Sequence, residues 1–242
     1  MKNNRIIGLI GARGGSKGIP NKNVAVVGGY PLIVYSITVS QMSKYIERTI
    51  VSTDSPDIRH IASISKAEVP FLRPPEYAKD DSIDYDYIKH ALDWLKETED
   101  YVPTLIVHLR PTTPLRDVSV VDTAIAKFLQ CPEATSMRSV ELLRESPYKI
   151  FLKDDDYLMP FVQTREGEFY NLPRQHFPKA YRPNGYVDIL RPSVIAKGSL
   201  HGDKIMPFDT KRVIELDSEE DFEDLQRYYK ESSTWSLLEN NC

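Results

Sequence analysis

The chain opens with a short apolar run, which leads directly into a glycine-rich, basic loop. Residues 5–10 read Arg-Ile-Ile-Gly-Leu-Ile, which has the length and the β-branched content of a buried parallel strand. Residues 11–18 follow as Gly-Ala-Arg-Gly-Gly-Ser-Lys-Gly, and Lys22 adds a further cation. Because ligands of open α/β sheets bind beyond the carboxyl ends of the strands, this junction predicts an α/β fold with a binding loop after its first strand.

The rest of the chain alternates between strand and helix patterns. The clearest helix is expected at residues 84–99, where apolar residues recur at spacings of three and four. Strands are predicted at 5–10, 49–53, 104–109, 134–140, 186–190 and 212–217, and helices at 31–42, 54–67, 84–99 and 118–129. A last helix is expected after Ser218, since Asp221 three residues later has capping-box spacing. This rhythm predicts a Rossmann-like α/β fold whose mostly parallel sheet carries helices on both faces.

Residues 146–182 break this alternation. The segment holds four prolines and eight aromatic residues, and aromatic side chains need burial. We expect an inserted lobe or a dimer interface there, within a single domain that spans residues 1–242.

Composition excludes several classes of protein. The net charge of −4 argues against a nucleic-acid binder, and no apolar run reaches the roughly 18 residues that a membrane helix needs. Cys131 and Cys242 cannot form a disulfide framework, so we expect a cytoplasmic protein. The first 46 residues contain six lysines and arginines and no acidic residue, which predicts a local anion site.

The loop itself fits a triphosphate. Glycines let the backbone approach a ligand closely, exposed N–H groups form an anion-binding nest, and Arg13, Lys17 and Lys22 add positive charge. It is no Walker loop, because Lys17 follows Ser16 and precedes Gly18, and its glycines lack the spacing of a dinucleotide fingerprint.

The motif from Ala12 to Asn23, Ala-Arg-Gly-Gly-Ser-Lys-Gly-Ile-Pro-x-Lys-Asn, resembles the signature loop of the nonulosonic (sialic) acid cytidylyltransferases. The resemblance continues through Arg-Pro-Thr-Thr-Pro-Leu-Arg at 110–116, Ser-Pro-Tyr-Lys at 146–149 and Glu-x-Asp-x-x-x-Asp-Phe at 215–222. It implies the fold of the nucleotide-diphospho-sugar transferases and the reaction of CTP with a keto sugar acid to give the CMP-sugar and pyrophosphate. It further implies Mg²⁺ as cofactor and a homodimer.

The resemblance also implies roles for individual residues. Arg13, Lys17 and Asp217 would be catalytic, Lys22 would join Arg13 and Lys17 on the triphosphate, and Asn23 would hold the nucleotide. Further substrate-binding positions are Ala12, Gly14, Gly15, Ser16, Ser82, Arg110, Pro111, Thr112, Lys149, Arg174, Gln175, Asn184 and Asp188.

Glu215 and Asp217 are the metal candidates. Alternation along a strand would put both side chains on one face, and carboxylates suit Mg²⁺. The family usually has Asp-x-Asp here, so Glu215 is a departure. The alternative is that both belong to the solvated, acidic start of the last helix, where seven of ten residues from 215 to 224 are acidic.

Two other departures concern the substrates. Arg110 stands where the family has glutamine, and arginine only donates hydrogen bonds, so it would reach the cytosine carbonyl or a phosphate, or the base preference would differ. Asp188 is an additional carboxylate, which would touch a sugar hydroxyl or amine or pair with Arg191. Arg174 is the first candidate for the sugar carboxylate and Lys149 the second.

Two alternative functions stay open on these residues. One is another sugar nucleotidyltransferase that uses a different nucleotide or sugar, and the other is a nucleotide-sugar binding module without turnover. His90 and His108 are interpreted as structural, because the five histidines show no metal-ligand spacing. No general base is evident.

Overall fold

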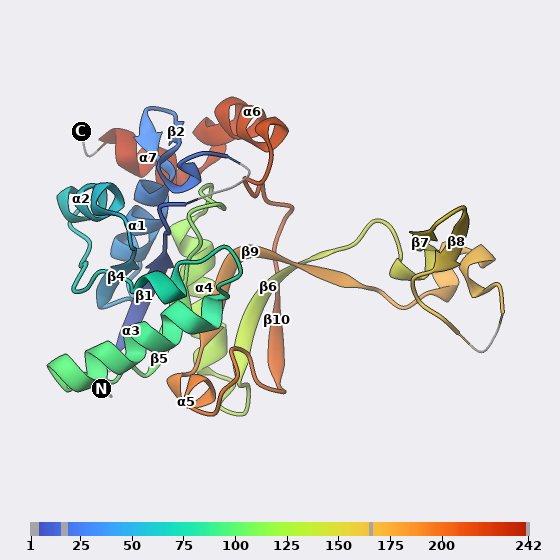
Figure 1. Cartoon of the computed structure of the whole chain (residues 1–242), viewed down its shortest axis with the longest axis horizontal. Helices are drawn as coiled ribbons and strands as arrows, with labels where there is room; N and C mark the ends of the chain where they lie inside the picture. The colour runs from blue at the N-terminus through green and yellow to red at the C-terminus, as the bar shows by residue number, and fades with distance from the viewer. Residues whose placement is uncertain (1–4, 16–18, 165–166, 241–242) are drawn as a thin grey trace.

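The computed structural model describes residues 5–15, 19–164 and 167–240. Within them a six-stranded sheet has the order β10-β6-β9-β5-β1-β4 (Figure 1). Its strands are β1 (Ile6–Gly11), β4 (Arg48–Ser52), β5 (Leu105–His108), β6 (Ser136–Leu142), β9 (Tyr181–Leu190) and β10 (Ile205–Asp209). The β1–β4, β1–β5 and β6–β10 pairs are parallel, whereas β9 runs antiparallel to β5 and β6. The predicted mostly parallel sheet is therefore confirmed.

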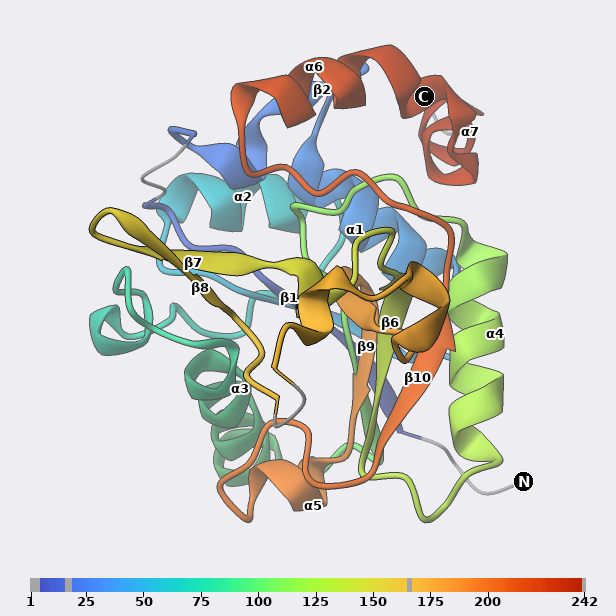
Figure 2. The same ribbon diagram turned by 90° about the vertical axis from the view of Figure 1, so that its right-hand side faces the viewer.

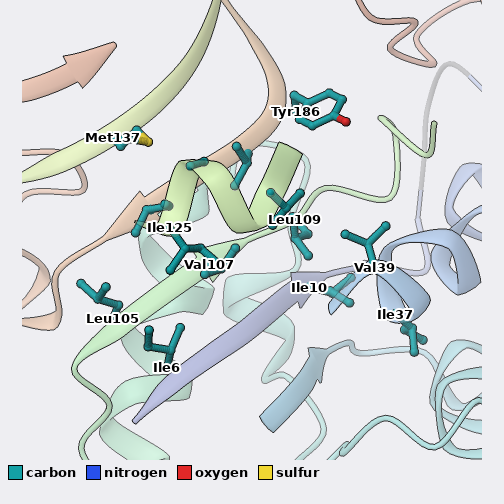
Figure 3. Packing of buried hydrophobic residues seen from close by; sticks show 14 of the residues in the cluster. Ile6, Ile10, Ile37, Val39, Leu105, Val107, Leu109, Ile125, Met137 and Tyr186 are labelled. Carbon is teal, nitrogen blue, oxygen red and sulfur yellow. The ribbon is translucent and has the colours of Figure 1, made fainter. Parts of the chain in front are cut away.

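Helices cover both faces of the sheet, as Figures 1 and 2 show. One face packs against α1 (Leu32–Met42), α2 (Pro56–Ile64) and α4 (Val118–Leu129), and the other against α3 (Asp84–Glu99) and α5 (Pro192–Ile195). Side chains alternate along each strand, so Ile6 and Ile10 enter the first layer while Ile7 and Leu9 enter the second. Figure 3 shows the first layer around Ile10, Val107 and Ile125. All four helices predicted before residue 130 are present.

The predicted strand at 212–217 is wrong. The edge of β6 is already paired with β10, which lies earlier in the chain and was not predicted. After Thr210 donates its N–H to Val140 O, the chain leaves the sheet and crosses beyond the strand ends as a loop. Leu216 is fully buried in that loop, and its N–H donates to Thr112 O at 2.7 Å. The apolar alternation of this segment reflects packing of a loop, and no ladder forms.

The C-terminal helices pack against the segment 26–42. The predicted capping box is confirmed: Ser218 accepts from Asp221 N–H at the start of α6 (Glu219–Tyr228), and Asp221 accepts from Ser218 N–H. The helix α7 (Ser233–Asn240) packs beside α1, and the hairpin of β2 (Val26–Val27) and β3 (Tyr30–Pro31) lies near it (Figure 1). Among the described residues, no helix is both long and apolar enough to cross a membrane. Short 3-10 turns occur at Lys22–Val24, Pro75–Tyr77, Pro147–Lys149, Phe169–Asn171, Arg174–His176 and Tyr229–Glu231.

The segment between β6 and β9 projects from the body of the molecule (Figure 1). It carries a hairpin of β7 (Phe151–Asp154) and β8 (Tyr157–Pro160) and a small aromatic cluster. Tyr148 stacks on Phe177 with ring centroids 5.6 Å apart, and Phe169 meets both rings edge-on. Other apolar side chains of the segment are exposed: Ile150, Phe151, Leu152, Tyr157, Leu158, Met159 and Phe161. The lobe thus has a minimal core of its own and a largely uncovered apolar surface.

Candidate functional site

A cleft of about 290 Å³ opens beyond the carboxyl ends of β1 and β5. Seven predicted site residues line it: Arg13, Lys22, Asn23, Ser82, Arg110, Pro111 and Thr112. The remaining lining residues are Gly11, Arg73, Tyr77, Asp80, Asp84 and Tyr87, which were not among the predicted site residues. The predicted residues Ser16 and Lys17 lie outside the described part of the chain. The structure therefore brings residues from three separate segments into one cleft at the expected edge of the sheet.

The described part of the binding loop is held by hydrogen bonds. Arg13 donates to Lys79 O at 2.6 Å and forms an ion pair with Asp80 at 3.3 Å. Asn23 is almost fully buried, and its side-chain amide donates to Arg13 O at 2.9 Å. Asn23 thus fixes the loop while it lines the cleft.

The other predicted loop positions differ in exposure. Ala12 is fully buried and its N–H donates to Ser52 O, so it extends the hydrogen bonding between β1 and β4 by one residue. The N–H of Gly14 donates to the carboxylate of Asp54 at 2.9 Å. Gly15 is exposed, and a Cβ there would meet no neighbour within 4 Å. Of these three backbone positions, Gly15 has the open surroundings that a ligand requires.

The floor of the cleft is a buried aromatic contact. A Cβ at Gly11 would lie only 2.4 Å from Cζ of Tyr87, so glycine is required where β1 ends. The Tyr87 hydroxyl is hydrogen-bonded to Nε2 of His108, and the Arg73 guanidinium lies 4.3 Å from the Tyr87 ring centroid. Burial raises the pKa of Tyr87 and, together with the charge of Arg110, lowers the pKa of His108 to about 4. Both groups are neutral near pH 7.

Arg110 is held between two carboxylates. Its guanidinium donates to Asp84 at 2.6 Å and to Asp188 at 2.9 Å. Asp188 is only 1% exposed and also pairs with Arg138 at 3.3 Å. Burial alone would raise the pKa of Asp84. In the acidic range where Asp84 titrates, however, His108 is protonated, and its charge together with that of Arg110 lowers the pKa of Asp84 to about 2.

Asp188 does not pair with Arg191, which was one of the two roles that the sequence left open for it. Arg191 instead donates to the backbone oxygens of Ala134 and Cys131. Asp188 faces Arg110 because the antiparallel register places it opposite His108 on β5, close to where Arg110 begins the next loop.

A second cleft adjoins the first and contains the predicted metal residues. Asn184, Glu215 and Asp217 line it together with Arg182 and Asp221. Lys22 connects the two clefts, because its ammonium donates to Asp217 Oδ1 at 2.8 Å and to Leu216 O at 2.7 Å.

The donor set of this second cleft suits a hard cation. Glu215 and Asp217 both line this cleft although their segment is a loop, and burial, followed by the charge of Asp217, raises the pKa of Glu215. The buried hydroxyl of Thr113 has no hydrogen-bond partner, and a Cβ at Gly185 would lie 3.0 Å from it and 3.5 Å from Glu215 Oε1. Among the described residues no three His, Cys, Asp or Glu side chains gather into a cage. Two carboxylates that leave places for water and phosphate oxygens are the pattern that Mg²⁺ favours.

The structure does not bring the predicted sugar-acid residues of the lobe to either cleft. Arg174 and Gln175 are exposed and line a separate hollow with Phe177, and Lys149 lies with Nζ 5.5 Å from that ring's centroid. Figure 1 shows the lobe extending away from the strand ends. Asn184, in contrast, lies in the second cleft, where its amide donates to Thr210 Oγ1 at 2.7 Å.

Arg116 shapes the loop that begins at Arg110. It is fully buried and donates to Tyr186 O, Gly185 O, Arg110 O and Ser36 Oγ at 2.5 to 3.1 Å. None of these partners is a carboxylate. The sequence offered one signal for this role, because Arg116 closes the motif at 110–116.

Comparisons with known proteins agree with this geometry. A family model described as cytidylyltransferase matches residues 7–232. The chain is 32% identical to the N-acylneuraminate cytidylyltransferase of Escherichia coli O18:K1:H7 over 76% of its length, a match that spans 42% of that protein. It is 30% identical to the CMP-N,N'-diacetyllegionaminic acid synthase of Campylobacter jejuni, over 90% of this chain and 92% of that one.

Among solved structures, CMP:2-keto-3-deoxy-manno-octonic acid synthetase in complex with CTP superimposes with a TM-score of 0.69. The superposition covers 94% of this chain and 99% of that one at 12% identity, so it shows a shared fold. With the family model matching nearly the whole described sheet, the chain belongs to the cytidylyltransferase family, in the group that contains the nonulosonic acid enzymes.

Proposed function

We propose that this protein transfers the cytidylyl group of CTP to a nonulosonic keto sugar acid and releases pyrophosphate. The observation that carries the proposal is the convergence of Arg13, Lys22 and Asn23 with the Arg110–Thr112 segment in one cleft at the strand ends. The names of the relatives supply the substrate class. In the reaction the anomeric hydroxyl oxygen of the sugar acid forms a bond to the α-phosphorus of CTP. The bond from the α-phosphorus to the oxygen that bridges to the β-phosphate breaks, pyrophosphate leaves, and the hydroxyl proton is released.

The charges in the clefts suit this chemistry. Arg13 forms an ion pair with Asp80 and Lys22 with Asp217, and a triphosphate would draw both cations to itself. Phosphoryl transfer is catalysed mostly by positioning and charge neutralisation, which both side chains can supply from the cleft that they line. Lys17, in the same loop, is proposed as a third cation.

We propose Mg²⁺ as the cofactor, with Asp217 and Glu215 as its protein ligands. When bound, the ion would neutralise phosphate charge and orient the triphosphate. Release of Asp217 from Lys22 would free one carboxylate for the metal at the moment when Lys22 turns to phosphate.

We also propose a homodimer formed through the lobe. The lobe exposes Leu152, Tyr157 and Leu158 at 49%, 78% and 66%, an apolar surface that favours burial against a second copy. Arg174, Gln175 and Lys149 line neither cleft of their own chain, so their proposed contact with the sugar carboxylate requires the cleft of another chain.

Pyrophosphate release tests the activity. The protein would be incubated with CTP, Mg²⁺ and a panel of sialic, legionaminic, pseudaminic and other keto sugar acids. We expect release with at least one acid and its loss in Lys22→Ala, while Lys204→Ala, an exposed lysine that lines neither cleft, keeps full activity. No release with any acid, by a protein that binds CTP, would leave only a nucleotide-binding module.

Arg110 favours one alternative, a nucleotidyltransferase with another base preference, because its guanidinium can only donate. Thermal shifts with CTP, UTP, GTP and ATP distinguish this alternative from a CTP-dependent enzyme, since a ligand that binds only the folded state raises Tm. A larger shift with a nucleotide other than CTP would replace CTP in the proposal.

Mixing two inactive variants tests the dimer and the lobe together. Lys22→Ala removes a cleft residue and Arg174→Ala a lobe residue, and each alone should be inactive. If the lobe of one chain completes the cleft of the other, mixed dimers contain one intact site and about a quarter of the wild-type activity returns. A monomer in light scattering, or no recovery despite subunit exchange, would contradict this arrangement.

A further inference from the structure

A third hydrophobic core is distinct from the two layers of side chains that pack on the sheet. Its fully buried members come from the β2–β3 hairpin, the start of α1, the loop after β10 and α6: Val27, Leu32, Leu216 and Leu225. Partly buried side chains complete it: Ile19, Ala25, Leu115, Ile214, Phe222 and Tyr229. Among the described residues, none of its members belongs to the six-stranded sheet. The third core therefore joins the flank of the binding loop to the C-terminal segment.

Leu216 connects the third core to the first cleft through its backbone. Its side chain is fully buried in the third core, and its N–H donates to Thr112 O at 2.7 Å. Its carbonyl oxygen accepts a hydrogen bond from Lys22 Nζ, also at 2.7 Å. Both Thr112 and Lys22 line the first cleft. One residue thus ties two cleft residues, which come from separate segments of the chain, to the third core.

The carbonyl group of Leu216 is suited to hold a cation for an anionic ligand. Lysine carries three N–H donors on a flexible stem, so its ammonium needs fixed acceptors to keep one position. Asp217 also accepts from Lys22, but its negative charge competes with a phosphate for the ammonium. The peptide oxygen of Leu216 has no net charge. It therefore fixes the ammonium and leaves the charge of Lys22 to the ligand.

The helix α6 is anchored on the hairpin that follows the binding loop. Gln226 donates from its side-chain amide to Val26 O at 2.7 Å. The ring of Tyr229, directly after α6, lies so close to Gly28 that a Cβ there would be 2.4 Å from Tyr229 Cδ2. Leu225 is the buried residue of α6, and it lines neither cleft. The third core can therefore be altered at Leu225 without a change in either cleft lining.

We propose that Leu216 and Leu225 are positioning residues, which hold Lys22 in the first cleft through the third core. The inference deepens the proposed function and rests on it, because it concerns how the cleft is ordered for a triphosphate. Shortening Leu225 removes packing from the third core, and the neighbouring side chains close such a gap only in part. Leu216 O then shifts relative to the cleft, and Lys22 loses its neutral acceptor.

Leu225→Ala tests the inference in CTP binding by calorimetry, at a temperature where circular dichroism shows that every variant is folded. We expect CTP to bind about fivefold or more weakly than to the wild type, which is the lower end of the usual coupling between separate sites. Leu225→Met keeps the volume of the side chain and should restore most of the affinity. Leu95→Ala is the matched control, since Leu95 is equally buried in the layer beneath α3 and lines neither cleft. It should lower the stability of the fold and leave the CTP affinity unchanged.

A double variant isolates the part played by Lys22. If Leu225 acts through Lys22, the loss of affinity caused by Leu225→Ala should shrink when Lys22→Ala is already present, because changes that share one partner are not additive. Leu225→Val, a smaller change, takes the place of Leu225→Ala if that variant does not fold. Wild-type CTP affinity in the folded Leu225 variants, or fold-changes that simply multiply in the double variant, overturns the inference. Failure of the proposed function would appear in the wild type itself, as an absence of CTP binding.

Discussion

The buried His108 makes the folded protein sensitive to mild acid. The ring is 1% exposed beneath the cleft, Nε2 is hydrogen-bonded to Tyr87, and Nδ1 has no partner. Asp84 and Asp188 favour its protonation, but burial and the charges of Arg110 and Arg116 outweigh them and lower its pKa from 6.5 to about 4. Protonation of His108 therefore costs free energy in the folded state that it does not cost in the unfolded chain.

The sign and size follow from proton linkage. The pKa is depressed on folding, so the stabilisation is complete above pH 6.5 and is lost as the pH falls from 6.5 to about 4. A shift of that size corresponds to about 3 kcal/mol in full, and about 2 kcal/mol of it is lost by pH 5. In a chain of 242 residues, about 2 kcal/mol lowers Tm by roughly 4 to 8 °C.

His108→Gln provides the comparison, because an amide can keep the bond to Tyr87 and does not titrate. Urea unfolding of both proteins at pH values from 7.5 to 4.5 gives the difference in unfolding free energy between them. We expect the wild type to lose about 2 kcal/mol relative to the variant between pH 7 and pH 5. If both proteins unfold in two states and the difference in their unfolding free energies stays constant over this pH range, the lowered pKa of a buried, neutral His108 is refuted.

Three further predictions concern packing and charge. Gly11→Ala should lower the free energy of unfolding by about 1 to 3 kcal/mol, because its Cβ meets the Tyr87 ring at 2.4 Å; an unchanged urea midpoint would contradict this. Arg116→Met should cost about 3 kcal/mol or more by leaving several buried oxygens unpaired, so a stable variant in the same assay would show that water replaces the guanidinium. Asp217→Asn should abolish the gain in CTP affinity that Mg²⁺ gives, while CTP binding in EDTA stays equal or tightens because Lys22 is freed; calorimetry with and without the ion measures both.

The sheet and its helices follow from local patterns that the sequence displays clearly. The 84–99 and 118–129 helices begin and end as expected, because their apolar spacing is a local pattern. Residues 212–217 show the limit of this reasoning. Their apolar alternation suits a strand, but only the assembled sheet shows that β10 already occupies the edge of β6 and that the chain leaves the sheet after Thr210.

Part of the site could likewise be predicted. Arg13, Lys22 and Asn23 lie in the cleft because the glycine-rich loop directly follows β1. The role of Arg110 could not be predicted, since its partners Asp84 and Asp188 are far away in the sequence and meet it only through the α3 contact and the antiparallel register of β9. Pairings between distant segments are decided by the topology of the sheet.

Acidic residues pair with the cations of the binding loop, in addition to the metal role proposed for Glu215 and Asp217. Within the part of the binding loop that the structure describes, Arg13 forms an ion pair with Asp80 and Lys22 forms one with Asp217. If a triphosphate binds Arg13 and Lys22 as proposed, nucleotide binding is an exchange of ion pairs, so the net gain in free energy is smaller than the number of cations suggests and is sensitive to ionic strength. In the proposed site a carboxylate released by a phosphate would become available to a divalent ion only once the nucleotide is present, so CTP and the ion would each raise the affinity for the other by the same factor.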